Sequence, residues 1–274
     1  FSGDEVAEWN AMRRAGRAVG EAVLLDSREC GGIPDDGRLL VLVGKGHNGG
    51  DALLAALTIL AARSAATVDV LFVFGSRPLR PLAARAWREL VHGARGRVRE
   101  VRVIEGAYDA ALDGVFGFQF RPPVEPRVTA LLDAVNAAAV RFRAAVDLPS
   151  AGIFRADFTY ATGSVKTPVL EGDAAGRVRY LDLGFFRGDE AGSRRVLLPR
   201  NLEPLARLRP SVSDKRSFGH VFILGGSAAF PGSVLLATLA ALKSGAGLVT
   251  AFVPESLVPA YAAQAPEAMW VGWP

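Results

Sequence analysis

Short apolar runs alternate with longer amphipathic or alanine-rich stretches along the first two thirds of the chain. Apolar runs bounded by turn residues indicate buried strands, and apolar residues at helical spacing indicate helices. The pattern predicts strands at Leu39–Val43, Val68–Phe74, Val98–Val103, Ala111–Phe116, Arg143–Leu148, Ala156–Ala161 and Val178–Leu183. It predicts helices at Asp4–Leu25, Asp51–Arg63, Pro81–His92 and Glu125–Val140. This alternation is typical of an α/β, Rossmann-like domain in three layers with a mostly parallel sheet.

The pattern then weakens and restarts. Residues 187–217 are rich in Arg, Pro and Gly, with little apolar periodicity, which predicts a connector. The apolar pattern after it predicts a strand, a helix and a strand at His220–Leu224, Ser233–Ser244 and Leu248–Val253. We therefore expect one domain over 1–186 and an incomplete second α/β domain over 218–274. A single βαβ unit in the second domain has too little chain to close a core by itself.

The turn after the first strand is a candidate anion-binding loop. Residues Gly44–Asp51 read Gly-Lys-Gly-His-Asn-Gly-Gly-Asp and precede an alanine-rich stretch. Glycines before a helix let backbone N–H groups approach a phosphate closely. The loop departs from the dinucleotide fingerprint and lacks the Lys-Ser/Thr pair of a P-loop. A tight turn with Asp51 as the helix N-cap would explain the glycines, but it would not explain His47 and Asn48.

Two further predicted strands end in polar residues. Asp113 precedes a turn at Gly117, and Asp147 and Ser150 follow an apolar strand. Ligands bind beyond the carboxyl ends of parallel strands, so we expect these side chains and Asn48 at one site. Oxygen donors of this kind could hold an alkali cation, and a partly desolvated Asp147 suits acid–base work. Taken singly, Asp113 and Asp147 are explained equally well as turn and cap residues.

Composition narrows the classes of function. The chain has 274 residues, half of them hydrophobic, and a net charge of +4. The arginines are scattered without interleaved aromatic residues, which disfavours nucleic-acid binding. Cys30 is the sole cysteine, which fits a reducing, cytoplasmic compartment, and no apolar stretch or signal peptide predicts a membrane segment. A homo-oligomer is left open, and the start at Phe1 leads us to expect a fragment or a processed chain.

With these residues in hand, the chain resembles the bifunctional NAD(P)H-hydrate repair enzymes of the YjeF type. Gly44–Ala52 is similar to the family's G-x-G-N-N-G-G-D-G, and Asp113–Phe120 to its D-x-x-x-G-T-G-L. Val146–Ser150 resembles V-D-I-P-S-G, and Ala11–Val19 resembles L-M-E-N-A-G-R-A-V. Beyond the connector, Lys215–Pro274 looks like the opening of a ribokinase-like NAD(P)HX dehydratase.

The resemblance implies an NAD(P)HX epimerase that interconverts the R and S hydrates at C6 of the nicotinamide ring. It implies potassium held by Asn48, Asp113 and Ser150, with Asp147 as the proton-transfer group. The implied substrate-binding residues are His47, Asn48, Gly49, Gly50, Asp51, Gly117, Phe118, Gln119, Phe120, Arg121, Pro122, Pro123 and Asp147. The second domain implies dehydration with ADP or ATP. Its Gly-x-Gly-Asp stretch is not in these residues, so we expect that activity only from a longer protein.

Departures from the family pattern keep other hypotheses open. His47 replaces an Asn, Phe118 and Gln119 replace Thr-Gly, and the family's longer loop after Ser150 is missing. A second hypothesis is therefore a catalytically degenerate member that binds an ADP-containing dinucleotide or a partner protein. A third is a ribokinase-like carbohydrate kinase, suggested by the Gly225–Ser227 loop. The choices between NADHX and NADPHX, and between ADP and ATP, stay open.

Overall fold

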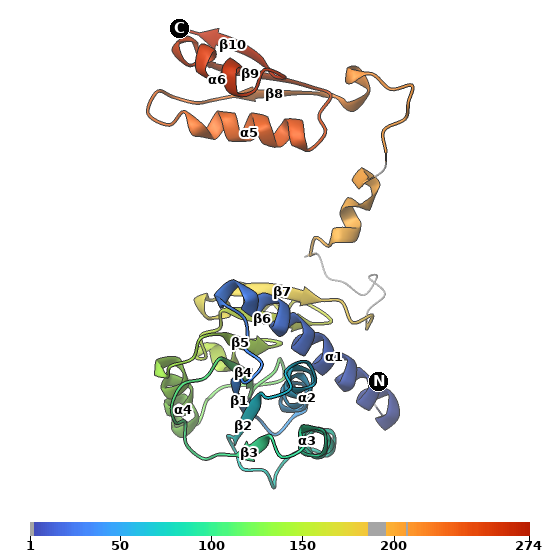
Figure 1. Ribbon diagram of the computed structural model, residues 1–274, viewed down its shortest axis with the longest axis vertical. Helices are drawn as coiled ribbons and strands as arrows, with labels where there is room; N and C mark the ends of the chain where they lie inside the picture. The colour runs from blue at the N-terminus through green and yellow to red at the C-terminus, as the bar shows by residue number, and fades with distance from the viewer. Residues whose placement is uncertain (1–2, 186–195, 207) are drawn as a thin grey trace. The chain divides into compact units, whose positions relative to one another are not determined.

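The computed structural model describes residues 3–185, 196–206 and 208–274. The chain divides into two units, Phe1–Val196 and Leu197–Pro274, each with its own sheet (Figure 1). The predicted domain end at residue 186 and part of the predicted connector, 187–217, lie outside the described residues. The boundaries of the predicted domains therefore stay a prediction.

The first unit is a parallel sheet between helices. Its strand order is β3-β2-β1-β4-β5-β6-β7, and every strand pair among the described residues is parallel. The strands are β1 (Arg38–Val43), β2 (Thr67–Phe72), β3 (Val98–Glu100), β4 (Ala110–Gly114), β5 (Arg143–Val146), β6 (Phe158–Thr162) and β7 (Arg177–Leu181). The helices are α1 (Glu5–Asp26), α2 (His47–Ala62), α3 (Pro81–Ala94) and α4 (Pro126–Ala137). The prediction of a three-layer, Rossmann-like α/β fold is confirmed.

Strand β1 shows why this sheet has two hydrophobic faces. Leu39 and Val41 pack in the cluster that includes α1, α2 and α3, whereas Leu40 and Leu42 pack with α4. Side chains alternate across a strand, so a strand covered on both faces reads as one continuous apolar run. Each buried leucine contributes about 1.5–3 kcal/mol to stability. These two cores fix the carboxyl ends of the strands, where the polar residues lie.

Helix α2 begins four residues before the predicted Asp51. It starts at His47, and Gly46 is its N-cap, so the predicted start at Asp51 is wrong, and so is the alternative of Asp51 as the N-cap. The reason is close packing of the first helical turn on the end of β1. A β-carbon on Gly49 would lie 2.5 Å from a backbone oxygen of the preceding loop. Gly49 and Gly50 therefore belong to the helix, and Asp51 lies inside it.

The edge strand β3 is shorter than the predicted Val98–Val103. It pairs only with β2, and the pairing ends at Glu100 opposite Val70. Strands β6 and β7 are each displaced by one or two residues from their predicted positions. Ends of this kind depend on how far a neighbouring strand offers hydrogen-bond partners, which an apolar pattern does not reveal.

The second unit has a parallel sheet in the order β10-β9-β8. Its elements are β8 (His220–Leu224), α5 (Gly232–Lys243), β9 (Leu248–Pro254), α6 (Val258–Gln264) and β10 (Met269–Trp273). The prediction of a single βαβ unit is wrong, because α6 and β10 form a second one. Tyr261 of α6 and Trp270 of β10 pack with Val234, Ala251 and Val253 in a small core.

One face of this second sheet is largely uncovered. Phe222 and Leu224 of β8 and Met269 and Val271 of β10 are exposed, although they lie in a sheet. The core of the second unit is thus on the side of α5 and α6 alone. Among the described residues of the chain, no helix is long and apolar enough to cross a membrane.

Candidate active site

A cleft opens at the carboxyl ends of β1 and β4. The chain leaves β1 for β2 on one side, and β4 lies on its other side, so the sheet order reverses here. Ligands of doubly wound α/β proteins bind at such a switch point. The cleft has a volume of about 550 Å³. We call it the switch-point cleft; it is lined by Lys45, Gly46, His47, Asn48, Asp51, Phe74, Arg80, Val115, Phe116, Gly117, Phe118, Gln119, Phe120, Glu125, Asp147 and Thr162.

The switch-point cleft has an aromatic wall and cationic groups beside it. Phe116 and Phe120 stack with ring centroids 4.1 Å apart. Lys45 Nζ lies 4.6 Å from the centroid of the Phe74 ring, and Arg80 also lines the cleft. Aromatic faces suit planar rings, and Lys and Arg near the N-terminus of α2 suit anions. The lining therefore fits a ligand that has both a ring and phosphates.

The three predicted potassium ligands are linked through the backbone of Phe116 and through Ser150. Asn48 Nδ2 donates a hydrogen bond to the carbonyl oxygen of Phe116 over 2.9 Å. The backbone N–H of Phe116 donates to Ser150 Oγ, also over 2.9 Å. Ser150 Oγ in turn donates to Asp113 Oδ1 over 2.6 Å, and the Ser150 backbone N–H donates to Asp113 Oδ2 over 2.7 Å. Residues from α2, from β4 and from the turn after β5 are thus linked in one cluster.

The Asp113 carboxylate is fully buried, and burial raises its pKa to about 6. Hydrogen bonds from Ser150 and from the backbone of Val115 oppose this rise. Among the described residues, no cationic side chain is a partner of the Asp113 carboxylate. Asn48 Oδ1 accepts no hydrogen bond there, and Ser150 Oγ and Asp113 Oδ2 keep spare lone pairs. Such a set of neutral and charged oxygens fits a potassium ion.

Asp147 has an unusual backbone and a cationic partner. It follows β5 with φ of +69°, a left-handed conformation that is strained for a residue other than glycine. Its Oδ1 accepts a hydrogen bond from Thr162 Oγ1 over 3.0 Å and pairs with the Lys166 ammonium. Lys166 also donates to the Thr162 carbonyl oxygen over 2.8 Å. The strained loop thus holds a carboxylate against a lysine whose side chain is only 15% exposed.

A second carboxylate, Asp51, lines the same cleft. Burial raises the pKa of Asp51 well above its ordinary value, and the negative charge of Asp147 raises it further. The positive charge of Lys166 acts in the opposite direction. Two of the carboxyl groups that line the cleft, Asp51 and Asp147, therefore interact electrostatically with each other and with Lys166. Our sequence reasoning assigned no role to Lys166, because its partner lies 19 residues away along the chain.

Some predicted substrate-binding residues do not line the cleft. Arg121 Nη1 donates to the carbonyl oxygens of Phe118 and Phe120, over 3.0 and 2.8 Å, and so stabilises their loop. The other predicted residues that the lining omits are Gly49, Gly50, Pro122 and Pro123, whereas Phe118 does line the cleft, although it is 53% exposed. Their contact with substrate stays a prediction, as do the roles of the lining residues.

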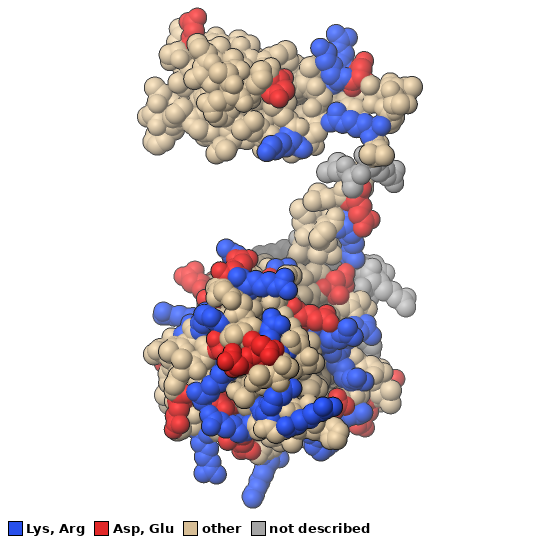
Figure 2. Space-filling model, viewed as in Figure 1, with Lys and Arg blue, Asp and Glu red and all other residues tan. Residues whose placement is uncertain are grey.

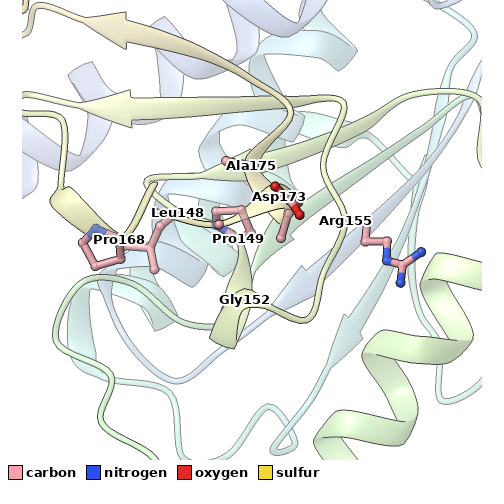
Figure 3. A pocket seen from close by; sticks show the side chains of 9 residues that line it. Leu148, Pro149, Gly152, Arg155, Pro168, Asp173 and Ala175 are labelled. Carbon is pink, nitrogen blue, oxygen red and sulfur yellow. The ribbon is translucent and has the colours of Figure 1, made fainter. Parts of the chain in front are cut away.

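A second cavity lies beside the loop after Asp147. It has a volume of about 450 Å³, with Leu148, Pro149 and Pro168 among its lining residues. Figure 3 shows that the Arg155 side chain extends away from Asp173, so these two charged groups of the cavity lining do not converge. We assign no site to this cavity.

The fold and the switch-point cleft define the first unit as a doubly wound α/β ligand-binding domain. A family model described as "YjeF-related protein N-terminus" matches residues 9–170. The chain therefore belongs to the YjeF-related family. Residues 221–273, in the second unit, match a family described as "NAD(P)H-hydrate dehydratase".

Relatives carry both units in one longer chain. The bifunctional NAD(P)H-hydrate repair enzyme Nnr of Gloeobacter violaceus is 37% identical, over 94% of this chain and 53% of that protein. The protein of the same name from Moorella thermoacetica is 28% identical, over 96% of this chain and 53% of that protein. The chain thus spans about half the length of these curated relatives.

A solved structure shares the fold. The crystal structure of the yeast protein ynu0 matches with a TM-score of 0.50 and 18% identity, over 63% of this chain and 77% of that one. At this level of identity the likeness supports the architecture alone.

Proposed function

We propose that the first unit is an NAD(P)HX epimerase, which interconverts the R and S hydrates of NADH or NADPH. The observation that carries the proposal is Asp147, held in a strained turn against Lys166 in a cleft that adjoins the Asn48–Asp113–Ser150 cluster. A strained, ion-paired carboxylate at a switch point favours catalysis over a purely structural role. The names of the relatives, NAD(P)H-hydrate repair enzymes, support the hydrates of NADH and NADPH as the substrate class.

The substrate would lie along the cleft with its two ends in different surroundings. The hydrated ring would lie near Asp147, because the reacting carbon needs an acid–base group within hydrogen-bond reach. The phosphates would lie at the start of α2, near Lys45 and Arg80, where backbone N–H groups and cations favour anions. The stacked rings of Phe116 and Phe120 would contact a base or a ring.

A potassium ion would be held by Asn48, Asp113 and Ser150. When bound, it supplies a positive charge beside a carboxylate that has no cationic side chain among its described partners. Because Asn48 and Ser150 bond to the backbone of Phe116, and Asp113 bonds to Ser150, these residues fix the loop that forms one wall of the cleft. The role of this chain's residues is thus to order the 115–120 loop against α2.

The second unit would supply part of a dehydratase. In a longer protein with both activities, the epimerase would convert the R hydrate into the S hydrate, and the dehydratase would use ADP or ATP to remove its water. The match of residues 221–273 to the dehydratase family supports this assignment.

The test is epimerisation of purified R-NADHX in potassium buffer. An added S-specific dehydratase reports each S molecule as it forms, and a reaction without the chain measures spontaneous epimerisation. Turnover above that background supports the epimerase. No turnover, with a dinucleotide still raising the melting temperature, supports the degenerate binder instead. Phosphoryl transfer to a sugar would support the carbohydrate kinase.

The surface agrees with a small-molecule substrate. Figure 2 shows Lys and Arg side chains interspersed with Asp and Glu over the visible face of the first unit. A nucleic-acid surface would present a continuous basic stripe instead.

A further inference from the structure

Two carboxyl groups of the switch-point cleft differ in their partners. Asp51 comes from the second turn of α2, and Asp147 comes from the loop after β5. Asp147 is bonded to Thr162 and Lys166. Asp51 makes no side-chain hydrogen bond or ion pair within the part of the chain that the structure describes, although it lines the cleft. Asp51 is therefore free to bond to a ligand.

We propose that Asp51 is a second proton-transfer group, the acid that acts with Asp147 as the base, and that Lys166 is the positioning residue that keeps the two in opposite charge states. This inference deepens, and rests on, the proposed epimerase function. It adds an acid to a site in which a single carboxylate would otherwise have to both give and take a proton.

The charges of the cleft support this division of roles. Two carboxyl groups in one cleft do not readily ionise together, because their negative charges repel each other. The carboxyl group that is paired with a cation ionises first. Lys166 pairs with Asp147 and so stabilises its charge. Burial and the charge of Asp147 both raise the pKa of Asp51, which favours its protonated form. The other charged or titratable residues that line the cleft are Lys45, His47, Arg80 and Glu125.

The pair balances the chemistry at C6. Asp51 gives a proton to the C6 hydroxyl, the C–O bond breaks, and water leaves with the bonding electrons. The lone pair of the ring nitrogen forms a double bond to C6. A water molecule then adds to the opposite face of C6, the double-bond electrons return to nitrogen, and Asp147 takes the proton of the incoming water. One water leaves and one enters, one proton is given and one taken, and no atom changes its oxidation state. Exchange with solvent restores the two protonation states.

The charge arrangement can be measured without turnover. Carbon-13 NMR of the side-chain carboxyls of the whole chain, at fixed potassium, follows the titration of Asp51, assigned by its loss in Asp51→Asn. We expect Asp51 to titrate above the ordinary carboxyl range. Asp147→Asn should lower its midpoint, because a negative neighbour is removed, and Lys166→Met should raise it, because a positive neighbour is removed.

A matched variant controls for net charge. Lys45→Met removes the same charge from the same cleft, but Lys45 lies over the Phe74 ring rather than beside the carboxyls. It should shift the Asp51 midpoint much less than Lys166→Met does. An ordinary midpoint for Asp51, or shifts in the same direction in Asp147→Asn and Lys166→Met, overturns the opposite-charge arrangement.

Kinetics test the roles. Asp51→Asn should lower the kcat of R-NADHX epimerisation by about 100-fold or more, with KM within about threefold. Lys166→Met should lower kcat and move the alkaline limb of the pH profile upward, whereas Lys166→Arg should restore both. A kcat of Asp51→Asn within threefold of the parent protein overturns the proposal. Absence of turnover in the parent protein would instead contradict the proposed function, while the NMR titration would still decide the charge arrangement.

Discussion

The seven-stranded sheet buries carboxylates in different ways at the side where its strands begin, here called the amino edge, and at the side where they end, the carboxyl edge. At the amino edge, Asp69 of β2 is 2% exposed and accepts hydrogen bonds from Arg38, Arg99 and Tyr108. Burial alone would raise the pKa of Asp69, but these hydrogen bonds outweigh burial and lower it. The Asp69 carboxylate is therefore ionised, and its partners within the chain balance its negative charge.

At the carboxyl edge, the balance is reversed. The pKa values of Asp51 and Asp113 are both raised, because burial there is not offset by an arginine. Lys166 opposes the rise in the Asp51 pKa, but it pairs with Asp147. Carboxylates that hold a fold together receive their counter-charges from the chain, whereas carboxylates of a site keep room for an ion, a substrate or a proton. The difference between the two edges therefore marks the functional one.

The comparison is tested most strongly at Asp147. Asp147→Asn should reduce epimerisation by about 10³-fold, because the base is lost. Dinucleotide binding should stay within tenfold, about 1.4 kcal/mol, because the shape of the cleft is kept. Steady-state kinetics on R-NADHX and calorimetric titration with a dinucleotide measure the two effects.

The matched control is Asp173→Asn, at an exposed carboxylate of the neighbouring cavity that lies outside the switch-point cleft. This control should keep the activity of the parent protein. If Asp147→Asn retained more than a tenth of the activity, Asp147 would have no place in proton transfer.

At the amino edge, the same kind of change should affect stability and not activity. Asp69→Ala leaves Arg38 and Tyr108 without their buried partner, and we expect a loss of about 2 kcal/mol in the free energy of unfolding. Denaturant unfolding measures this loss, and kcat at 25 °C should be unchanged. Arg17→Ala, which breaks the exposed Arg17–Glu21 pair, should leave stability unchanged. A fall in kcat of Asp69→Ala without loss of folded protein would argue against the division between the edges.

Much of the fold is predictable from the sequence because burial on both faces leaves a clear signal. The run Leu39–Val43 is apolar throughout, and its strand is found within one residue of the prediction. The start of α2 is missed because Gly49 and Gly50 read as a loop, although tight packing puts them in a helix. The second βαβ unit is missed because α6 has only 7 residues, too few to show a helical period.

The site is predictable only in part. Strand-end reasoning groups Asn48, Asp113 and Ser150, and the structure links them through the Phe116 backbone and the Ser150–Asp113 hydrogen bond. Lys166 matches the lysine of the family's A-D-x-T…K stretch, but its role is missed because its partner Asp147 lies 19 residues away along the chain. Asp51 is placed at the site by its motif but is given the wrong structural role. Contacts between distant loops thus limit what spacing alone can show.

The carboxyl edge should respond to potassium. At a potassium concentration of ten times Kd, the folded protein should gain about 1.4 kcal/mol over the same protein in choline buffer of equal ionic strength. Ser150→Ala removes a ligand and the hydrogen bond to Asp113, so its gain should be much smaller, whatever its own stability. Thermal unfolding in the two buffers measures the difference. An equal gain from sodium, or an unchanged gain in Ser150→Ala, would mean that the cluster is not a selective potassium site.

The smallest effect is expected at Phe118, the departure that most favours a degenerate member. Its ring is 53% exposed, at the mouth of the cleft, and Gly117 keeps the close approach to Asn48. Because the backbone of the loop is held by Arg121, Phe118→Thr should change KM by less than about threefold, or 0.65 kcal/mol, and leave kcat unchanged. Phe118→Leu serves as the apolar control. A rise in kcat of tenfold or more in Phe118→Thr would show that the phenylalanine obstructs catalysis, and that the carboxyl edge is less well formed for the reaction than its charges indicate.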